Sequence, residues 1–162
     1  MNSVSGFFET EADMHQWLVS NAESFNTGAV LYMRGNLGAG KTSFCRALIQ
    51  ALGYEGRVKS PTYTLLEVYD LAQRTVCHFD LYRMADPEEL FFIGADDYNQ
   101  QDALWLVEWP EKGEGALPAA DVIVELRHPD QNSDGSAGKG RLFSIAACTN
   151  RGESLVKNLH GL

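Results

Sequence analysis

The sequence predicts an α/β fold with three layers, in which helices flank a mixed central β-sheet. In the first part of the chain, short apolar segments typical of strands alternate with amphipathic segments typical of helices. Further along, strand-like segments follow one another, and two of them are separated only by a polar loop. Alternation of strand and helix predicts parallel strands, whereas a hairpin is antiparallel, so we expect one sheet that contains both.

The first helix is predicted to begin near Thr10. Thr10 and Asp13 have the spacing of a capping box, with Asp in place of the usual Glu. The apolar residues Met14, Trp17 and Leu18 follow at helical spacing. We therefore expect this helix to bury one face against the sheet.

A strand, a loop and a second helix are expected next. Ala29–Met33 is a short apolar run with little alternation, which is typical of a strand covered on both faces. After Gly40, apolar residues from Phe44 to Leu52 mark one face of a helix, and Gly53 is placed to end it.

The remaining elements are indicated by shorter patterns. Asp86 and Pro87 can open a helix, since Asp caps and Pro is tolerated in the first turn. The segment Pro129–Gly140 has no apolar residue larger than alanine and is interpreted as a flexible loop. We expect strand-forming segments at Val58–Asp70, Thr75–Leu81, Leu104–Val107, Val122–Leu126 and Leu142–Ala147, and a short helix at Ser154–Leu159.

Length and composition favour one globular domain spanning residues 1–162, with a net charge of −9. An acidic surface repels a phosphate backbone, so we expect no tight autonomous binding to nucleic acid. No apolar run approaches the roughly 18 residues that cross a bilayer, so no membrane association is expected. The start of the chain does not resemble a secretory signal. Cys45, Cys77 and Cys148 lie in apolar stretches and are expected to be buried free thiols, which favours a cytoplasmic protein.

The strongest functional signal is the segment GNLGAGKT, from Gly35 to Thr42. It matches the pattern G-x-x-x-x-G-K-[ST] and lies between a predicted strand and a predicted helix, as the pattern requires. Glycines let backbone N–H groups turn inward around an anion, and the helix presents its N-terminal N–H groups to the same phosphates. The segment predicts a phosphate-binding loop, or P-loop, for a nucleoside triphosphate.

Each side chain of this loop has an expected role. Lys41 adds a positive charge near the β and γ oxygens, and the Thr42 hydroxyl is offered to Mg²⁺. The cofactors implied are ATP and Mg²⁺. The ATP-binding residues expected in the loop itself are Leu37, Gly38, Ala39, Gly40, Lys41, Thr42 and Ser43.

A carboxylate at the end of a neighbouring strand is expected to complete the metal site. Asp80 and Glu108 each follow a strand-like run, and the spacing favours Glu108 because its run is uniformly apolar. Both can face the site, where each raises the pKa of the other. His78, within the first run, is interpreted as a packed strand residue rather than a base.

Two further features leave alternatives open. The hydroxyls of Ser60, Thr62 and Thr64 follow the P-loop helix, and they fit a loop that senses phosphate and metal as well as they fit a β-prone loop punctuated by proline. Trp109 belongs either to the core or to a lid over the site. No segment of the type that recognises guanine is present, so adenine is favoured by default.

Four motifs, GNLGAGKTS, SPTYTLLEVY, HFDLYR and EWPE, occur in this order and resemble those of the TsaE (YjeE) family. The resemblance runs from about Thr10 to about Arg151. Members are small bacterial P-loop ATPases required for the threonylcarbamoyladenosine modification of tRNA. The resemblance implies slow hydrolysis of ATP by the chain alone, and work with two partner proteins, TsaB and TsaD, through which tRNA is reached indirectly.

The resemblance also implies residue roles. Lys41, Asp80 and Glu108 are the catalytic residues, and Thr42 and Glu108 hold Mg²⁺. The switch-like residues are Ser60, Thr62, Thr64 and Trp109, and the residues expected to reach the base are Thr10, Glu11 and Arg151, the last in a loop after the final strand.

The chain departs from the usual family loop GDLGAGKTT, since Asn36 replaces the Asp and Ser43 the second Thr. Asn orients water but cannot take its proton, so slower hydrolysis is expected. Two other functions fit the same fold: a small-molecule kinase, and a non-catalytic adaptor that responds to ATP binding. The kinase is less favoured because Arg57, Arg74 and Arg83 are spread out rather than clustered.

Overall fold

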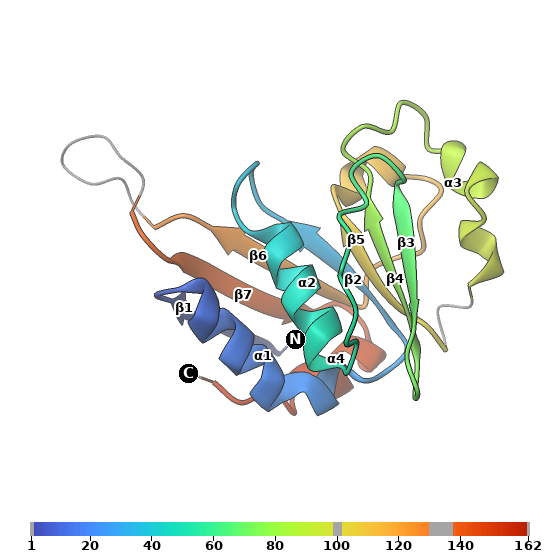
Figure 1. Cartoon of the computed structure of the whole chain (residues 1–162). Helices are drawn as coiled ribbons and strands as arrows, with labels where there is room; N and C mark the ends of the chain where they lie inside the picture. The colour runs from blue at the N-terminus through green and yellow to red at the C-terminus, as the bar shows by residue number, and fades with distance from the viewer. Residues whose placement is uncertain (1, 99–101, 130–137, 162) are drawn as a thin grey trace.

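A seven-stranded β-sheet forms the centre of the molecule (Figure 1). The structure is a computed structural model that describes residues 2–98, 102–129 and 138–161. The strand order is β1-β7-β6-β2-β5-β4-β3. The strands are β1 (Ser3–Phe8), β2 (Ala29–Arg34), β3 (Leu66–Asp70), β4 (Thr75–Asp80), β5 (Leu104–Glu108), β6 (Val122–Arg127) and β7 (Arg141–Ala147).

The sheet is mixed, as the sequence predicts. The four central strands β6, β2, β5 and β4 are parallel, and β1, β7 and β3 pair antiparallel at the two sides. The carboxyl ends of β2, β5 and β4 therefore meet at one edge of the sheet. In open α/β sheets this edge is where ligands bind.

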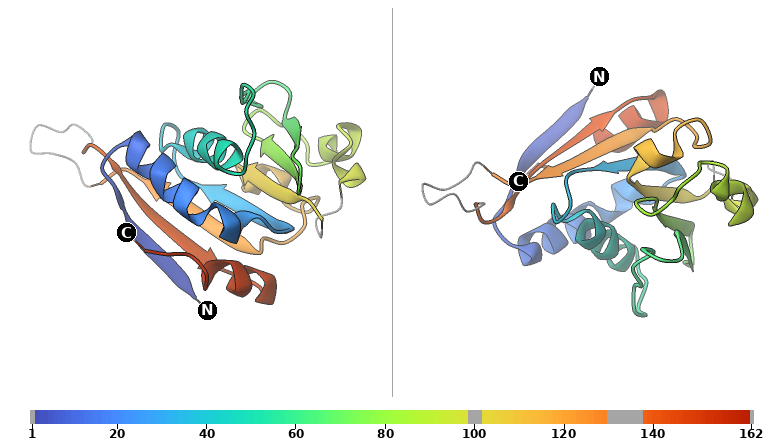
Figure 2. Two further views of the ribbon diagram at one scale, coloured as in Figure 1. Left: turned by 60° about the horizontal axis from the view of Figure 1, so that its bottom comes forward. Right: turned by 90° about the horizontal axis from the view of Figure 1, so that it is seen from above.

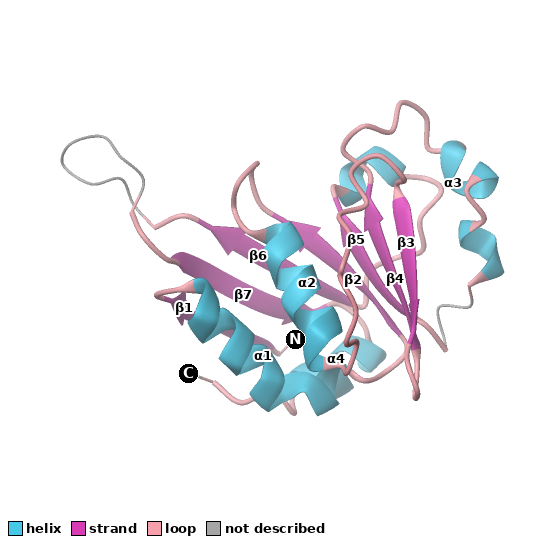
Figure 3. Ribbon diagram, in the orientation of Figure 1, coloured by secondary structure: helices cyan, strands magenta, loops and turns pink. Residues whose placement is uncertain are grey.

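Helices α1 (Glu11–Phe25) and α2 (Lys41–Ala51) lie side by side on one face of the sheet (Figures 1 and 2). Helix α4 (Asn150–Val156) packs on β7. The segments beside β4 and β5 contain the short helix α3 (Glu89–Phe92) and two 3₁₀ turns, Ala95–Asp97 and Pro110–Gly113. Figure 3 colours helices, strands and loops differently.

Side chains of β4 and β5 alternate between two apolar cores. Val76, Leu104 and Leu106 face α1 and α2, whereas Cys77 and Trp105 face the layer that holds α3. This alternation is the period of two that every strand imposes. It decides which side of the sheet each polar residue of these strands occupies.

Most of the expected elements are confirmed. Thr10 is the N-cap of α1 and forms the capping box with Asp13, the helix after Gly40 is α2, and Gly53 follows its end with φ 112°. The paired segments Val122–Leu126 and Leu142–Ala147 are the antiparallel strands β6 and β7. Of the loop expected at residues 129–140, residues 130–137 lie outside the described residues.

Several expectations are corrected. Strand β1 was not expected, because Ser and Gly separate Val4 from the two Phe residues of SVSGFF; the segment pairs antiparallel with β7 along its whole length. Residues 58–65 form no strand, so β3 begins only at Leu66. Helix α4 begins at Asn150, where Thr149 caps it, rather than at Ser154. Cys45 and Cys77 are buried, but Cys148 is exposed.

Among the described residues, no helix combines the length and the apolar character that a membrane span requires.

Candidate functional site

The candidate site forms where β2 ends and α2 begins. Gly35 has φ 152°, and a Cβ atom there would lie 2.5 Å from the carbonyl oxygen of Leu126, so only glycine fits beside β6. Gly40 caps α2 in the left-handed region at φ 105°, which glycine adopts without strain. The two glycines let the chain turn from a buried strand into a helix within a few residues. The backbone N–H groups at the start of α2 consequently point into the loop.

Lys41 is the first residue of α2, and only 5% of it is exposed. Its ammonium donates a hydrogen bond to the carbonyl of Gly35 and lies 3.5 Å from the ring centroid of Trp109. Burial lowers the pKa of Lys41, and the negative charges of Glu108, Glu111 and Asp80 oppose that shift. Lys41 is thus held at the loop by a carbonyl dipole and an aromatic face, both weaker partners than a phosphate.

Trp109 follows β5 in the left-handed conformation, with φ 57°. This unusual backbone turns the indole over Lys41, and the Tyr82 ring packs against it with centroids 4.9 Å apart. Trp109 is partly buried among residues of the second core, so both alternatives left open by the sequence apply in part: it is anchored in the core and it covers Lys41.

Asp80 and Glu108 lie directly opposite each other at the carboxyl ends of β4 and β5. One carboxylate oxygen of Glu108, Oε1, accepts a hydrogen bond from the hydroxyl of Thr42 at 2.7 Å. Glu108 is 2% exposed, and its contact with the P-loop helix makes it the nearer of the two acids to Thr42. Glu108 is therefore the acid in direct contact with Thr42, and its role as the metal ligand stays a prediction.

Asp80 belongs to a different set of contacts. Its Oδ1 accepts a hydrogen bond from the backbone N–H of Tyr82 at 3.1 Å, and its Oδ2 lies 3.5 Å from the hydroxyl of Thr62. Burial raises the pKa of Asp80, the Tyr82 N–H lowers it, and the charge of Glu108 raises it further. A carboxylate with a raised pKa is a better proton acceptor than an ordinary one.

The donor set suits a hard divalent cation. Thr42 offers a hydroxyl oxygen and Glu108 a carboxylate oxygen, and Mg²⁺ prefers such ligands over nitrogen or sulfur. Their direct contact shows that the two oxygens converge on one point at the N-terminus of α2. The residues present therefore fit a Mg²⁺ ion beside a bound phosphate.

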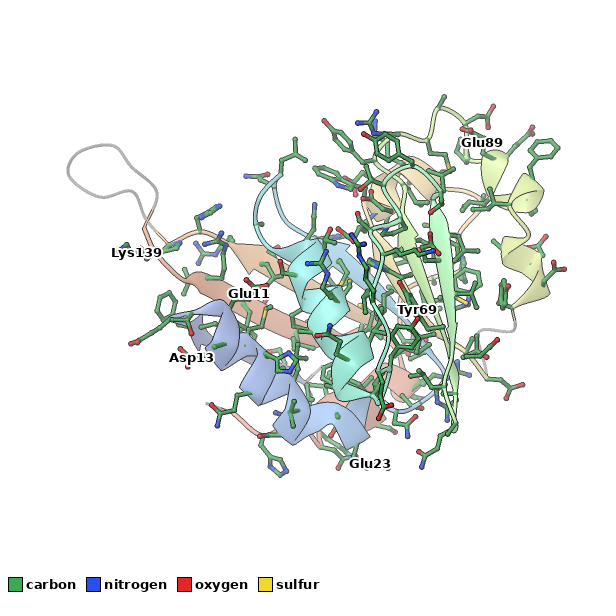
Figure 4. All side chains as sticks on the ribbon, in the orientation of Figure 1. Glu11, Asp13, Glu23, Tyr69, Glu89 and Lys139 are labelled. Atoms are coloured by element: carbon green, nitrogen blue, oxygen red, sulfur yellow. The ribbon has the colours of Figure 1, made fainter. Side chains whose placement is uncertain are left out.

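A pocket of about 150 Å³ opens on the other side of the loop. Thr10 and Glu11, the first residues of α1, line it together with Ala39, Gly40 and Ser43 of the loop, and Figure 4 labels Glu11 at this end of the helix. Thr10 and Glu11 therefore lie beside the P-loop, and the expectation that they reach the base stays a prediction. The capping box that starts α1 also sets the position of these two residues.

Arg141, a lining residue that sequence reasoning missed, is the first residue of β7. Its guanidinium donates hydrogen bonds to the carbonyls of Ala39 at 2.9 Å and Gly38 at 3.2 Å, and to Gly140 at 2.6 Å. Arginine forks of this kind hold planar acceptors in a fixed geometry. The only signal in the sequence was a lone arginine at the boundary between a polar loop and a strand.

Arg151 does not reach this pocket, and the expectation that it contacts the base is corrected. It lies in the first turn of α4, not in a loop, and 4.0 Å separates its guanidinium from the carboxylate of Asp121. Asp121 accepts a hydrogen bond from the N–H of Val30 at the start of β2, whereas the P-loop follows the end of that strand. Arg151 therefore lies at the opposite edge of the sheet.

The hydroxyl residues after α2 divide into two groups. Ser60 and Thr62 form a hydrogen bond at 2.7 Å, and Thr62 approaches Asp80, so these two border the candidate site. Thr64 instead donates to Glu67 of β3 at 3.1 Å. At the tip of the P-loop, Leu37 is 65% exposed.

A mixed sheet with a glycine-rich loop between β2 and α2, and with acids at the neighbouring strand ends, defines a protein of the P-loop fold. Bacillus subtilis YdiB, a solved structure, resembles the chain with a TM-score of 0.75 and 25% identity over 98% of this chain and 94% of that one. A family model described as "Threonylcarbamoyl adenosine biosynthesis protein TsaE" matches residues 8–136. The chain belongs to the TsaE family.

Relatives in three organisms carry the name tRNA threonylcarbamoyladenosine biosynthesis protein TsaE. The Haemophilus influenzae protein is 46% identical over 127 residues, which are 78% of this chain and 75% of that protein. The Treponema pallidum protein is 36% identical over 71% of this chain and 84% of its own length. The Bacillus subtilis protein is 33% identical over 82% and 78%.

Proposed function

We propose that the chain is a Mg²⁺-dependent ATPase that serves the threonylcarbamoyladenosine modification of tRNA. The names of its relatives support the process, since each is called a biosynthesis protein of this modified nucleoside. The geometry of the site supports the activity. The single observation that carries the proposal is the contact of Thr42 with Glu108 at the mouth of a glycine-rich loop that ends in Lys41.

The P-loop binds the polyphosphate of ATP. Its backbone N–H groups and the N-terminal end of α2 attract the negative oxygens, and Lys41 exchanges the Gly35 carbonyl for a phosphate. Because a charged partner is stronger than a carbonyl dipole, this exchange favours the bound state. The pocket lined by Thr10 and Glu11 then lies beside the loop as the place for the adenine base.

Thr42 and Glu108 would hold Mg²⁺, which when bound would neutralise charge on the phosphates. Asp80, whose pKa burial raises, orients the attacking water and accepts its proton. Thr62 contacts this carboxylate from the loop before β3, which suits a segment that responds to the state of the nucleotide. Asn36 at the exposed loop tip orients water without accepting a proton, so we expect slow turnover in the isolated chain.

The transfer of the threonylcarbamoyl group is assigned to TsaD, in complex with TsaB, rather than to this chain. A net charge of −9 opposes autonomous binding to tRNA, so we propose that tRNA is reached through that complex in the cytoplasm. The ATPase then drives a conformational step of the complex.

The test is phosphate release from ATP, measured with the chain alone and with purified TsaB and TsaD. We expect slow release alone, at least tenfold stimulation by the partners, and no phosphorylated acceptor. Lys41→Ala removes a charged hydrogen bond worth roughly 1.5–3 kcal/mol and should nearly abolish turnover. Equal release by Lys41→Ala and the parent chain would refute the ATPase.

Glu108→Gln distinguishes hydrolysis from a role in ATP binding alone. Gln keeps the size of the side chain, so ATP binding should persist while hydrolysis is lost. If this variant supported tRNA modification in a reconstituted reaction as well as the parent chain, the protein would be an adaptor. A phosphorylated small molecule among the products would instead identify a kinase.

A further inference from the structure

His78 lies in the middle of β4, fully buried, on the side of the sheet that faces α2. Its register partner on β5 is Leu106, and Glu108 follows two residues later on the same face. Diagonal neighbours of this kind are within reach of long side chains. Strand pairing alone therefore brings an imidazole beside the carboxylate proposed to hold the metal.

The contact between them is a short hydrogen bond. His78 Nε2 lies 2.6 Å from Glu108 Oε2, while the other oxygen, Oε1, accepts the bond from Thr42. An ionised carboxylate only accepts, so Nε2 carries the hydrogen and donates it. Among the described residues His78 Nδ1 has no hydrogen-bond partner, so Nε2 is the ring nitrogen that contacts the site.

The same three elements also bring Cys45 close, and a thiol, an imidazole and a carboxylate suggest a site for a soft metal ion. Their ligand atoms lie within 4.8 Å of one another. Two ligands on one tetrahedral zinc ion, each about 2.0–2.1 Å from the metal, lie about 3.4 Å apart. The 2.6 Å between Nε2 and Oε2 is instead the distance of a hydrogen bond, and the raised pKa of the buried Cys45 thiol keeps it protonated. We therefore interpret the cluster as support for Glu108.

The carboxylate of Glu108 has a fixed orientation only if both of its oxygens are engaged. Three rotatable bonds separate it from the backbone, and Thr42 alone holds one oxygen. The donor on the opposite side comes from β4, a strand fixed by pairing on both edges. A group that holds a metal ligand from behind commonly changes metal affinity by 10- to 100-fold when it is removed.

We propose that His78 is a positioning residue for the metal site: its Nε2–H holds Glu108 so that Oε1 faces Thr42 and the metal. This inference rests on the proposed function, since it concerns the same Mg²⁺ site. It assigns a role to the fully buried imidazole of β4. It also predicts that the loss of His78 weakens Mg²⁺ binding but leaves nucleotide binding in the absence of metal unchanged.

The test compares His78→Leu, which removes the donor, with His78→Gln, whose amide nitrogen reaches about as far as Nε2. Binding of a fluorescent ATP analogue is titrated in EDTA and at increasing Mg²⁺, and hydrolysis is measured alongside. For His78→Leu we expect the half-saturating Mg²⁺ concentration to rise at least tenfold. Affinity in EDTA should stay within twofold, and His78→Gln should recover most of the loss.

Val76→Ala is the matched control. Val76 is fully buried on the same face of β4, two residues earlier, and belongs to the apolar core. It should lower the unfolding temperature without moving the Mg²⁺ dependence. If His78→Leu fails to fold, His78→Asn replaces it, since its amide ends short of Nε2.

The proposal would be overturned if the Mg²⁺ dependence of His78→Leu equalled that of the parent chain. It would also be overturned if His78→Gln lost as much Mg²⁺ affinity as His78→Leu. Failure of the proposed function has a different signature. In that case the parent chain itself hydrolyses no ATP, whereas the binding titration still reports whether His78 supports the metal site. Nucleotide binding indifferent to Mg²⁺ in the parent chain would overturn both.

Discussion

Replacing Arg141 with alanine removes the side chain that connects β7 to the P-loop. Two of its hydrogen bonds reach loop carbonyls, those of Ala39 and Gly38. A hydrogen bond from a charged donor contributes roughly 1.5–3 kcal/mol when well buried. Because Arg141 is only partly buried, solvent screening reduces each bond to about 1 kcal/mol. Together they account for about 2 kcal/mol.

These hydrogen bonds keep the P-loop in one conformation, so their loss is expected to lower the affinity for nucleotide. At 1.4 kcal/mol for each factor of ten, the loss corresponds to roughly 30-fold weaker binding of ATP. The freed carbonyls can turn to water, so the unfolding temperature should change little. The ATP affinity of Arg141→Lys should be close to that of Arg141→Ala, since an ammonium keeps the charge but cannot make the paired hydrogen bonds of a guanidinium.

The assay is a fluorescence titration with an ATP analogue, at fixed Mg²⁺, together with a thermal unfolding curve. Arg57→Ala is the control, because it removes an equal charge from an exposed loop residue beyond the far end of α2. Affinity of Arg141→Ala within twofold of the parent chain would refute the reasoning. So would an equal loss in Arg57→Ala, which would reduce the effect to net charge.

Two further predictions concern stability. Burial raises the pKa of Asp80, so the folded chain binds that proton more tightly than the unfolded chain, and the associated stability is present below pH 3.8 and lost as the pH rises through the raised pKa. Asp80→Asn should therefore be more stable than the parent chain at pH 7, and a gain of about 1 kcal/mol would raise the unfolding temperature by about 2–4 °C. The difference should shrink near pH 4. Thermal unfolding curves at the two pH values test this, and a variant less stable than the parent at pH 7 would contradict it. In α4, a Cβ on Gly152 would lie 1.9 Å from the carbonyl oxygen of Asp121, so Gly152→Ala should cost about 1–3 kcal/mol in chemical unfolding. Gly161→Ala, in open space, should cost nothing measurable, and equal stabilities of the two variants would contradict the clash.

Local patterns predicted the parts of the fold that local physics determines. The capping box at Thr10, the apolar run of β2 and the amphipathic face of α2 are each complete within one segment of sequence. Strand β1 was missed because its conformation depends on hydrogen bonds to β7, more than 130 residues away. Residues 58–65 were expected as strand because their composition suits one. In the described structure the ladder with β4 begins only at Leu66, although the Leu65 carbonyl accepts a hydrogen bond from the N–H of Asp80.

The residues of the candidate site show the same contrast between local patterns and long-range contacts. Lys41 and Thr42 are identified by one contiguous motif, and the strand-end acids by the apolar runs before them. Arg141 was missed because its partners are backbone carbonyls, which leave no mark on the sequence. His78 was interpreted as a packed residue, and it is indeed buried, but its carboxylate partner depends on the register between β4 and β5.

That register also gives the acids a part in the formation of the sheet. If β4 slipped by one residue against β5, Asp80 would turn from the loop side into the apolar layer that holds Trp105. A carboxylate stranded there without a partner is penalised by an amount of the order of several kcal/mol. Sheets with this misalignment are therefore disfavoured, and the acids of the candidate site help to select the native register between β4 and β5.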